Sequence, residues 1–149
     1  MEFRDFSLHI NQIKVGRFAE ELAAGRIMAT QCRGCRAKYY PPRADCNRCW
    51  TSDMEWIPLQ GQGKLATFTR IHVPPEHFAA KPLMPFSPLV LQPCPIGLLE
   101  FDDGLRVMGW IPNLDPKDLR VGMSLRALPH TLADGKVTII LEPPDPKSR

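Results

Sequence analysis

The sequence predicts a mainly β protein, with one short helix near its N-terminus and a small metal-binding module in front of a strand-rich region. Three observations indicate this class. Two Cys-x-x-Cys pairs lie close together in the first third of the chain. The 149 residues include 16 prolines and 10 glycines, which favour turns and short strands over long helices. After residue 61, β-branched and aromatic residues recur in short runs that favour extended backbone.

The N-terminal part, residues 1–25, is expected to form an arm followed by a helix. Residues 17–24 are mostly good helix formers, and Phe18 and Leu22 lie four residues apart on one face. Gly25 is well placed to end the helix in a left-handed conformation. The spacing of the apolar residues in the arm, residues 3–15, fits a strand or a docked segment.

Four cysteines form the strongest motif of the chain. The pairs C-R-G-C and C-N-R-C are ten residues apart, and they contain Cys32, Cys35, Cys46 and Cys49. Such spacing brings four thiolates to one tetrahedral point, which predicts a structural Zn²⁺ site. Four thiolates leave no open coordination position, so no metal-bound water is expected there for catalysis. Strands at 27–30 and 55–59 are expected to enclose this module, residues 26–60, and Gly34 to supply left-handed backbone inside its first turn.

Residues 61–142 predict a β-barrel. Strands are expected at 64–73, 96–101, 105–111, 124–129 and 137–141. Asp102-Asp103-Gly104 predicts a hairpin, and Pro116 to Leu119 one helical turn capped by Asp115. A strand, a long loop, a hairpin, a short helix and two more strands suit a five-stranded Greek-key barrel of OB type. Residues 143–149 are expected to be a disordered tail.

Composition limits the class of partner and the compartment. The net charge of +3 is small, and no basic stripe of the kind that binds nucleic acid is visible. The first residues lead into no apolar signal segment, and reduced Cys-x-x-Cys pairs favour a cytoplasmic protein. The uncharged stretch 82–99 contains five prolines, which argue against a membrane-spanning helix.

Catalytic groups are not gathered in any known motif. The histidines His9, His72, His77 and His130 are scattered, and no G-x-S-x-G or comparable nucleophile motif accompanies them. Cys94, a lone cysteine between prolines, is expected to be a small buried apolar residue rather than a nucleophile.

Several motifs in colinear order closely resemble one known family. They are E-L-A-A-G-R-I, Q-C-R-G-C-R-A-K-Y-Y-P-P-R, C-N-R-C, W-I-P-L-Q-G-Q-G-K-L-A-T-F-T and D-L-R-V-G-M-S-L. Over residues 16–142 the chain resembles the zinc-ribbon/OB-fold accessory proteins. The resemblance implies an N-terminal helix, a rubredoxin-like zinc ribbon and an OB-fold barrel. The chain departs from the family at Arg36, where glycine is usual, at Trp50, where a small residue is usual, and in a longer loop at 74–95.

The resemblance also implies a function. Members of this family are usually partners of thiolase-like or ketoacyl-synthase-like enzymes that handle acyl-coenzyme A. It therefore implies a non-catalytic, zinc-binding subunit of a thiolase-type acyl-CoA acyltransferase complex, with a coenzyme A thioester as ligand of the complex. The substrates implied are small 3-ketoacyl-CoAs, aromatic ketoacyl-CoAs such as benzoylsuccinyl-CoA, and steroid side-chain thioesters. The sequence does not choose between them.

Seven residues are candidate contacts to a partner or to acyl-CoA. Arg43 or Arg48 could face the 3′-phosphate of coenzyme A, although the cations near the cysteines could simply balance the charge of about −2 on a zinc tetrathiolate. His72 falls where the family often carries histidine. The proline-stiffened segment 74–95 is apolar, which favours burial against a partner over a solvated loop. Its candidate contacts are His77, Phe78, Met84 and Phe86.

Two alternatives from other classes remain open. Phe68, Arg70 and His72 share one face of the first long strand, which suits a single-stranded nucleic-acid-binding module. Ordinary packing of Phe68 in the barrel explains the same pattern. A stand-alone hydrolase or lyase would need an assembled catalytic group, and the sequence shows none.

Overall fold

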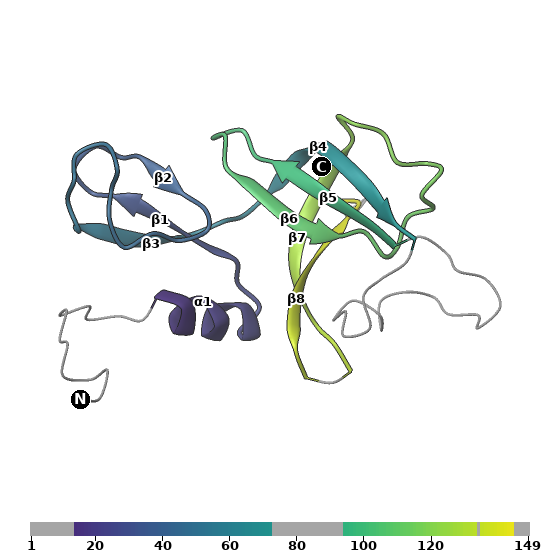
Figure 1. Ribbon diagram of the computed structural model, residues 1–149, viewed down its shortest axis with the longest axis horizontal. Helices are drawn as coiled ribbons and strands as arrows, with labels where there is room; N and C mark the ends of the chain where they lie inside the picture. The colour runs from purple at the N-terminus through teal and green to yellow at the C-terminus, as the bar shows by residue number, and fades with distance from the viewer. Residues whose placement is uncertain (1–13, 73–93, 134, 145–149) are drawn as a thin grey trace.

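A computed structural model describes residues 14–72, 94–133 and 135–144, and these residues form one helix and eight strands. Figure 1 shows a small sheet on one side of the molecule, a barrel on the other and the helix below them. The helix is α1 (Lys14–Ala23). The strands of the small sheet are β1 (Met28–Cys32), β2 (Lys38–Tyr39) and β3 (Met54–Pro58). The barrel strands are β4 (Gln62–Ile71), β5 (Cys94–Glu100), β6 (Arg106–Trp110), β7 (Ser124–Thr131) and β8 (Val137–Glu142).

The end of α1 has the geometry that its sequence predicts. Gly25 adopts φ +81°, and its N–H donates to the carbonyl of Leu22. The N–H of Arg26 donates to the carbonyl of Glu21 at 2.8 Å, which completes a Schellman motif. The helix begins at Lys14, three residues before the predicted start, so the last two residues of the expected arm are helical. The rest of that arm lies outside the described residues.

The small sheet has the order β2-β1-β3, and every pairing in it is antiparallel. All five residues of β1 are buried, so the central strand is the core of this module. β1 ends at Cys32, and its register places Cys32 opposite Met54. The sheet thereby fixes where the first cysteine pair begins.

The second module is a closed barrel with the strand order β4-β5-β6-β8-β7. Antiparallel pairings link its neighbours except β6 and β8, which pair in parallel, and β7 returns to β4 to close the barrel. This is the five-stranded OB arrangement that the sequence predicts. The turn at 102–104 is also confirmed, since Gly104 has φ +80° and Phe101 and Leu105 form the closing hydrogen bond.

The barrel core is apolar and tightly packed. Its buried side chains come from every barrel strand and from the connections between them: Leu65, Leu99, Phe101, Val107, Ile111, Leu119, Leu125 and Leu141. Gly97 on β5 faces this core, because a Cβ there would lie 2.6 Å from Leu65 Cδ1 and 3.0 Å from Ile111 Cδ1. A glycine is required at this position by space and not by its backbone angles.

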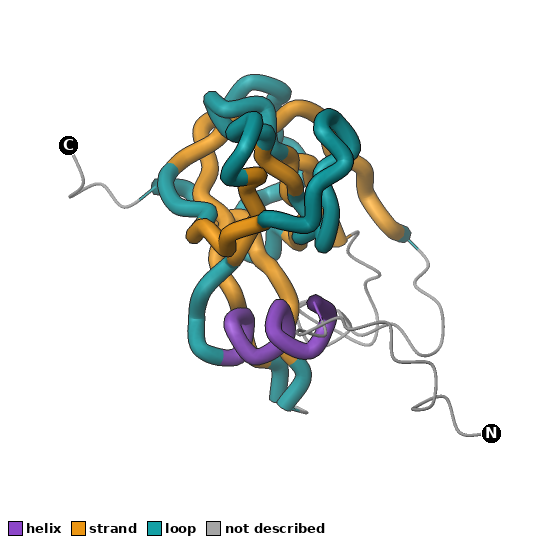
Figure 2. The backbone as a smooth tube through the Cα atoms, turned by 90° about the vertical axis from the view of Figure 1, so that its left-hand side faces the viewer, coloured by secondary structure: helices purple, strands orange, loops and turns teal. Residues whose placement is uncertain are grey.

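The helix packs between the two modules. α1 contacts β1 of the small sheet and both β7 and β8 of the barrel, as Figures 1 and 2 show from two sides. Phe18 meets the ring of Tyr40 edge-on at 6.0 Å, and the guanidinium of Arg17 lies 4.7 Å from the Trp56 ring centroid. Lys38 also bridges the modules, with its Nζ 2.8 Å from Asp103 Oδ2 in the barrel. The modules therefore share a packed junction.

The segment expected to be one helical turn is a tight turn that does not continue as a helix. The N–H of Asp118 donates to the carbonyl of Asp115, an i→i+3 bond, while Asp115 Oδ1 accepts from the N–H of Lys117 at 2.8 Å. The expected cap is present, but the backbone of 116–118 has turn geometry. Within the described residues, no helix is long and apolar enough to cross a bilayer.

Candidate metal centre

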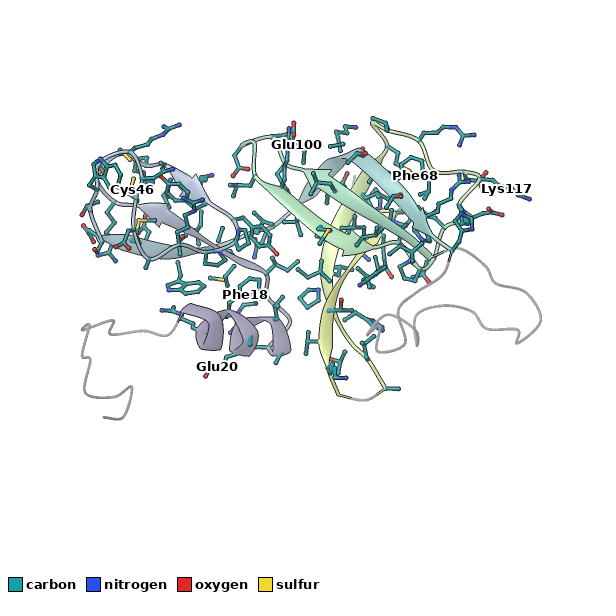
Figure 3. All side chains as sticks on the ribbon, viewed as in Figure 1. Phe18, Glu20, Cys46, Phe68, Glu100 and Lys117 are labelled. Atoms are coloured by element: carbon teal, nitrogen blue, oxygen red, sulfur yellow. The ribbon has the colours of Figure 1, made fainter. Side chains whose placement is uncertain are left out.

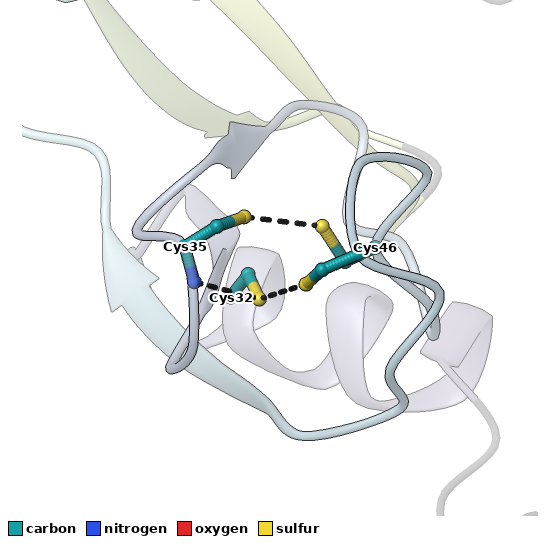
Figure 4. A group of neighbouring side chains, drawn as sticks. Cys32, Cys35 and Cys46 are labelled. Atoms are coloured by element: carbon teal, nitrogen blue, oxygen red, sulfur yellow. Dashed lines mark hydrogen bonds between the residues drawn. The ribbon is translucent and has the colours of Figure 1, made fainter.

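The structure brings the four predicted cysteines to one point. Their Sγ atoms all lie within 4.8 Å of one another. The closest pairs join the two motifs: Cys32 and Cys49 at 3.5 Å, and Cys35 and Cys46 at 3.4 Å. Figure 4 shows these sulfurs converging from two loops that face each other. Cys32 and Cys46 are buried, whereas Cys35 and Cys49 lie on the outer side.

Both cysteine loops have the same backbone pattern. In each, the residue after the second cysteine donates its N–H to the carbonyl of the first: Arg36 to Cys32 at 3.0 Å, and Trp50 to Cys46 at 2.9 Å. Each first cysteine then donates to the carbonyl five residues on, at Ala37 and Thr51. We call these two loops, residues 32–36 and 46–50, the first and second knuckles. Their shared pattern aims both thiol pairs at a common centre.

The left-handed positions in the knuckles differ from the prediction. Arg36 has φ 62° and Trp50 has φ 57°, while Gly34 does not have positive φ. The expectation that Gly34 supplies left-handed backbone is therefore wrong. A Cβ on Gly34 would make ordinary contacts, 3.8 Å from Cys32 Sγ and 3.9 Å from Cys49 Sγ. Both left-handed positions in the knuckles, Arg36 and Trp50, carry side chains, and this conformation costs such a residue roughly 1–2 kcal/mol.

Hydrogen bonds to sulfur set the protonation of the thiols. The Tyr39 hydroxyl lies 3.2 Å from Cys46 Sγ and 2.7 Å from Asn47 Oδ1. Its hydrogen bond lowers the pKa of Cys46 to about 6, with further help from the backbone N–H of Arg48. The hydrogen bond with Cys32 instead raises the pKa of Cys49 to about 12. The Tyr39 hydroxyl and the backbone N–H of Arg48 thus favour the thiolate form of Cys46, which is the form that binds a metal ion.

This donor set fits Zn²⁺. A tetrahedral site with Zn–S distances of about 2.3 Å has sulfur–sulfur edges of roughly 3.8 Å, close to the observed spacing. Cys32, Cys35, Cys46 and Cys49 would hold the ion, and zinc would supply a cross-link between the knuckles and a positive charge that keeps all four thiols ionised. Four sulfurs complete the coordination shell, so the chain's residues leave no place for a substrate on the metal.

Most cations near the centre are paired with other groups. Arg33 lies 3.5 Å from Asp53 and 3.6 Å from Glu55, and Arg36 lies 3.2 Å from Glu55. The Arg43 guanidinium stacks over Tyr39, 5.4 Å from the ring centroid. Arg48 is exposed and forms no ion pair with any residue the structure describes. The basic character that the sequence shows here is therefore largely neutralised, except at the second knuckle.

The other candidate contacts do not converge on the metal centre. Arg43 and Arg48 belong to the small module, whereas His72 is exposed at the end of β4 that lies away from it (Figure 1). His77, Phe78, Met84 and Phe86 lie outside the described residues, as does the side chain of Cys94.

Two of the three residues of the alternative nucleic-acid surface on β4, Phe68 and Arg70, make contacts within the barrel. Phe68 packs against the barrel core, and the Arg70 guanidinium lies 6.0 Å from its ring centroid. Arg70 also donates to the carbonyl of Pro116. Figure 3 shows Phe68 on the barrel, remote from Cys46. The packing explanation of the Phe68 pattern is therefore confirmed.

Sequence reasoning did not single out two side chains that support the site. Thr30 is fully buried, and its hydroxyl accepts from the N–H of Arg43 at 2.9 Å and faces the carbonyl of the same residue at 3.1 Å. It thereby fixes the segment that leads to the second knuckle. Tyr39, one position after Lys38 on β2, places its hydroxyl on Cys46. Both roles depend on contacts between residues that are distant in sequence. The Y-Y-P-P run, which contains Tyr39, was the one sequence feature noted near either residue.

The fold and the site together define a class, a cysteine-rich zinc ribbon joined to an OB-fold barrel. Comparison with known families assigns the chain more closely. The model of the ChsH2 rubredoxin-like zinc ribbon domain matches residues 19–55, and that of the ChsH2 C-terminal OB-fold domain matches residues 56–128. Since the two models together span most of the chain, this protein belongs to the ChsH2/DUF35 family of zinc-ribbon and OB-fold proteins.

Individual relatives agree with this assignment. A DUF35 domain-containing scaffold protein of Methanocaldococcus jannaschii is 30% identical over 103 residues, which are 68% of this chain and 66% of the relative. A probable enoyl-CoA hydratase alpha subunit of Thermomonospora curvata is 23% identical over 114 residues, 76% of this chain but 32% of that subunit. The matched segment thus spans about two thirds of the first relative and about one third of the second.

A solved structure shares the whole architecture. The chain of an Ltp2-ChsH2(DUF35) aldolase superposes with a TM-score of 0.71 over 89% of this chain and 95% of the other. The two are 18% identical in sequence. At this identity the match confirms the fold, a ribbon followed by an OB barrel.

Proposed function

We propose that this protein is a non-catalytic, zinc-binding subunit of a thiolase-type acyl-CoA acyltransferase complex. The observation that carries the proposal is the closed arrangement of four cysteines, with Cys32 and Cys46 buried and all Sγ atoms within 4.8 Å. Among the described residues, these cysteines are the only group of potential metal ligands that comes together. A site that coordinates its metal fully can stiffen a surface but cannot activate water or substrate.

The relatives support an accessory role in acyl-CoA chemistry. One is named a scaffold protein, one a subunit of a probable enoyl-CoA hydratase, and one belongs to an aldolase named as an Ltp2-ChsH2 pair. In our proposal the nucleophile belongs to a thiolase-like or ketoacyl-synthase-like partner, and this chain docks on that subunit and shapes the acyl-CoA site. Its contribution would be to orient the thioester and exclude water from it. The substrate would be a small 3-ketoacyl-CoA, an aromatic ketoacyl-CoA or a steroid side-chain thioester.

The proposed contact surface has two parts. One of the two exposed arginines of the ribbon, Arg43 or Arg48, would face the 3′-phosphate of coenzyme A. His72 marks the barrel end, where the chain continues into the apolar segment 74–95 with its candidate contacts His77, Phe78, Met84 and Phe86. Prolines in that segment would lower the entropy lost on docking.

Co-expression tests the proposal directly. The chain is expressed with a thiolase-like protein from the same genome, the complex is isolated through a tag on one subunit, and thiolysis of 3-ketoacyl-CoA is measured for the complex and for each subunit. We expect co-purification in a fixed ratio, one zinc per copy of this chain, and activity only when the thiolase-like subunit is present. Turnover of an acyl-CoA by this chain alone would contradict the proposal.

The apolar segment can be tested separately. Replacing residues 75–93 by a short Gly-Ser linker should abolish co-purification while zinc content stays unchanged, because the cysteines belong to another module. A matched control replaces the turn 133–135 with a Gly-Ser sequence of the same length, which should leave complex formation intact. Unchanged co-purification after the first replacement would remove the segment from the interface.

A further inference from the structure

The second knuckle presents a tryptophan to solvent. Trp50 follows the last cysteine and is 86% exposed. Within the part of the chain that the structure describes, it is more exposed than the other large apolar residues at the surface, Met108 and Val121. Its backbone has φ 57°, a conformation that glycine adopts most readily. An exposed indole gains nothing from folding, and a left-handed backbone disfavours any side chain here. Folding of the isolated chain therefore gives no reason for a tryptophan at this position.

The knuckle holds Trp50 in a fixed direction. Its N–H donates to the carbonyl of Cys46 at 2.9 Å, and the carbonyl of the next residue, Thr51, accepts from the N–H of Cys46 at 2.9 Å. Both bonds close on a cysteine whose sulfur points at the metal centre. A side chain carried on so constrained a loop loses little backbone entropy when it enters a pocket.

The charge beside Trp50 is also unmatched. In the first knuckle, Arg33 and Arg36 are paired with Asp53 and Glu55. In the second knuckle, Arg48 is exposed and forms no ion pair with a described residue. The indole and this guanidinium therefore lie two positions apart on one rigid loop, and both lack a counterpart within the described chain. Tryptophan and arginine are the residues most enriched at the energetic centres of protein interfaces.

We infer that Trp50 is the anchor of a docking surface on the second knuckle, and that it inserts into an apolar pocket bordered by carboxylates on the partner enzyme subunit. Arg48 pairs with those carboxylates. This inference rests on the proposed function and adds to it the place of contact and the chemistry of the partner's surface. In this inference the metal centre holds the second knuckle in place and thereby fixes the direction of the Trp50 side chain.

A protein surface suits these features better than a nucleic acid does. Binding of single strands uses several aromatic platforms along a continuous basic groove. Here one indole stands beside one unpaired arginine, and the neighbouring cations at Arg33, Arg36 and Lys38 are already matched by carboxylates. A second copy of the chain would have to bring a carboxylate-lined apolar pocket to Trp50. Of the carboxylates near the knuckles, Asp53 and Glu55 are paired with arginines, and Asp45 accepts from the Ser52 hydroxyl.

The test compares Trp50→Gly with Val121→Ala in binding to the thiolase-like subunit that co-purifies with the wild-type chain. Glycine keeps the left-handed backbone, so Trp50→Gly should retain one zinc and an unchanged or higher melting temperature. Val121, 65% exposed on the barrel, is the matched apolar control. We expect Trp50→Gly to weaken the measured Kd at least about tenfold, Arg48→Glu to weaken it and reduce its salt dependence, and Val121→Ala to leave it within about twofold.

Each outcome decides the inference. Wild-type affinity in the folded, zinc-loaded Trp50→Gly variant overturns it and leaves the proposed function standing. Failure of the wild-type chain to bind the thiolase-like subunit overturns both. Two further measurements address other occupants: quenching of Trp50 fluorescence by oligo(dT) in a Trp56→Phe/Trp110→Phe background, and sedimentation of the chain alone as a dimer that Trp50→Gly dissociates. Either positive result reassigns the surface and contradicts a partner enzyme as its occupant.

Discussion

Thr30 is the buried polar side chain that links the small sheet to the loop between the knuckles. It is fully buried, and its hydroxyl lies within 3.1 Å of both backbone polar groups of Arg43. Thr30→Val keeps the shape but leaves that N–H and carbonyl without partners. We expect the free energy of unfolding, measured by urea titration with excess zinc, to fall by about 1–3 kcal/mol.

Thr67→Val is the matched control for this change. Thr67 is exposed on β4, so the same substitution there should change the free energy of unfolding by less than about 0.5 kcal/mol. Equal effects at the two positions would show that the hydrogen bonds to Arg43 contribute nothing specific.

Ionisation of Tyr40 is expected to lower the stability of the folded protein at alkaline pH. Burial against the barrel core raises the pKa of Tyr40 from 10.0 to about 12. Because the folded state holds this proton more tightly than the unfolded state, the associated stability is complete below pH 10 and disappears as pH rises through 12. We expect a loss of about 1–2 kcal/mol over this interval, since part of the ring is still solvated.

The Tyr40→Phe variant isolates this contribution. Phenylalanine keeps the edge contact with Phe18 but cannot ionise, so its free energy of unfolding should decline less than that of the wild type between pH 10 and 12. Parallel declines in the two proteins would assign the alkaline instability to other groups.

Among single residues, the sequence predicts the metal ligands well but does not predict the side chains that hold the ligand loops in place. The cysteines could be predicted because their spacing alone fixes the geometry that zinc needs. Thr30 and Tyr39 could not, because each acts on a residue that only the folded sheet brings near. The left-handed positions at Arg36 and Trp50 were also missed, because the reasoning placed that conformation at the only glycine in the knuckles.

The ends of helices and strands were predicted best where a single residue type marks the end, as glycine does after a helix. Gly25 predicts the end of α1, and the observed Schellman bonds confirm it. Its beginning was missed, because the apolar spacing of residues 3–15 was interpreted as a strand or docked arm, whereas the observed helix starts at Lys14. β7 likewise continues past Pro129 to Thr131, since its pairing with β8 extends further than local propensity indicates.

Gly97 tests how tightly β5 packs into the barrel. Its Cβ would lie within 3.2 Å of Leu65, Ile111 and Leu141 at once, so Gly97→Ala must displace three core side chains. We expect the free energy of unfolding to fall by about 1–3 kcal/mol, measured by urea titration.

Gly34→Ala provides the comparison. Gly34 has neither positive φ nor a close neighbour, so alanine there should change stability by less than about 0.5 kcal/mol and leave zinc content unchanged. A large loss at Gly34 would restore the expectation that the first knuckle needs glycine inside the pair.

The whole molecule depends on the metal centre more than on any single contact. The buried apolar cluster at the metal centre consists of Ala37 and two of the ligands, Cys32 and Cys46, whereas zinc binding in such modules contributes roughly 10–16 kcal/mol at neutral pH. That is comparable to the entire stability of a domain. Cys46→Ser removes a buried ligand, so we expect β1–β3 to lose amide protection in hydrogen exchange.

The barrel serves as the internal control for this experiment. It has its own apolar core, so strands β4–β8 should stay protected when the ribbon opens. Cooperative loss of both modules would instead show that the junction formed by α1 and the Lys38–Asp103 pair makes them one folding unit. Persistence of ribbon protection in Cys46→Ser would contradict a structural role for the metal.

The order of the modules was predictable from the sequence, because each carries its own signal: a helix end, two cysteine pairs, and strands separated by Gly-rich turns. The contacts between modules were not, since Phe18 with Tyr40 and Arg17 with Trp56 join residues whose partners no local pattern specifies. Helix, ribbon and barrel are joined by packed contacts, and the second knuckle is exposed on the ribbon side.

Zinc K-edge X-ray absorption on the purified chain tests the central claim most directly. A sealed tetrathiolate predicts four sulfur scatterers at about 2.3 Å, with the spectrum unchanged when the partner subunit and acyl-CoA are added. An oxygen or nitrogen atom in the coordination shell, or a ligand exchanged on adding the thioester, would contradict it and give the metal a place in the reaction.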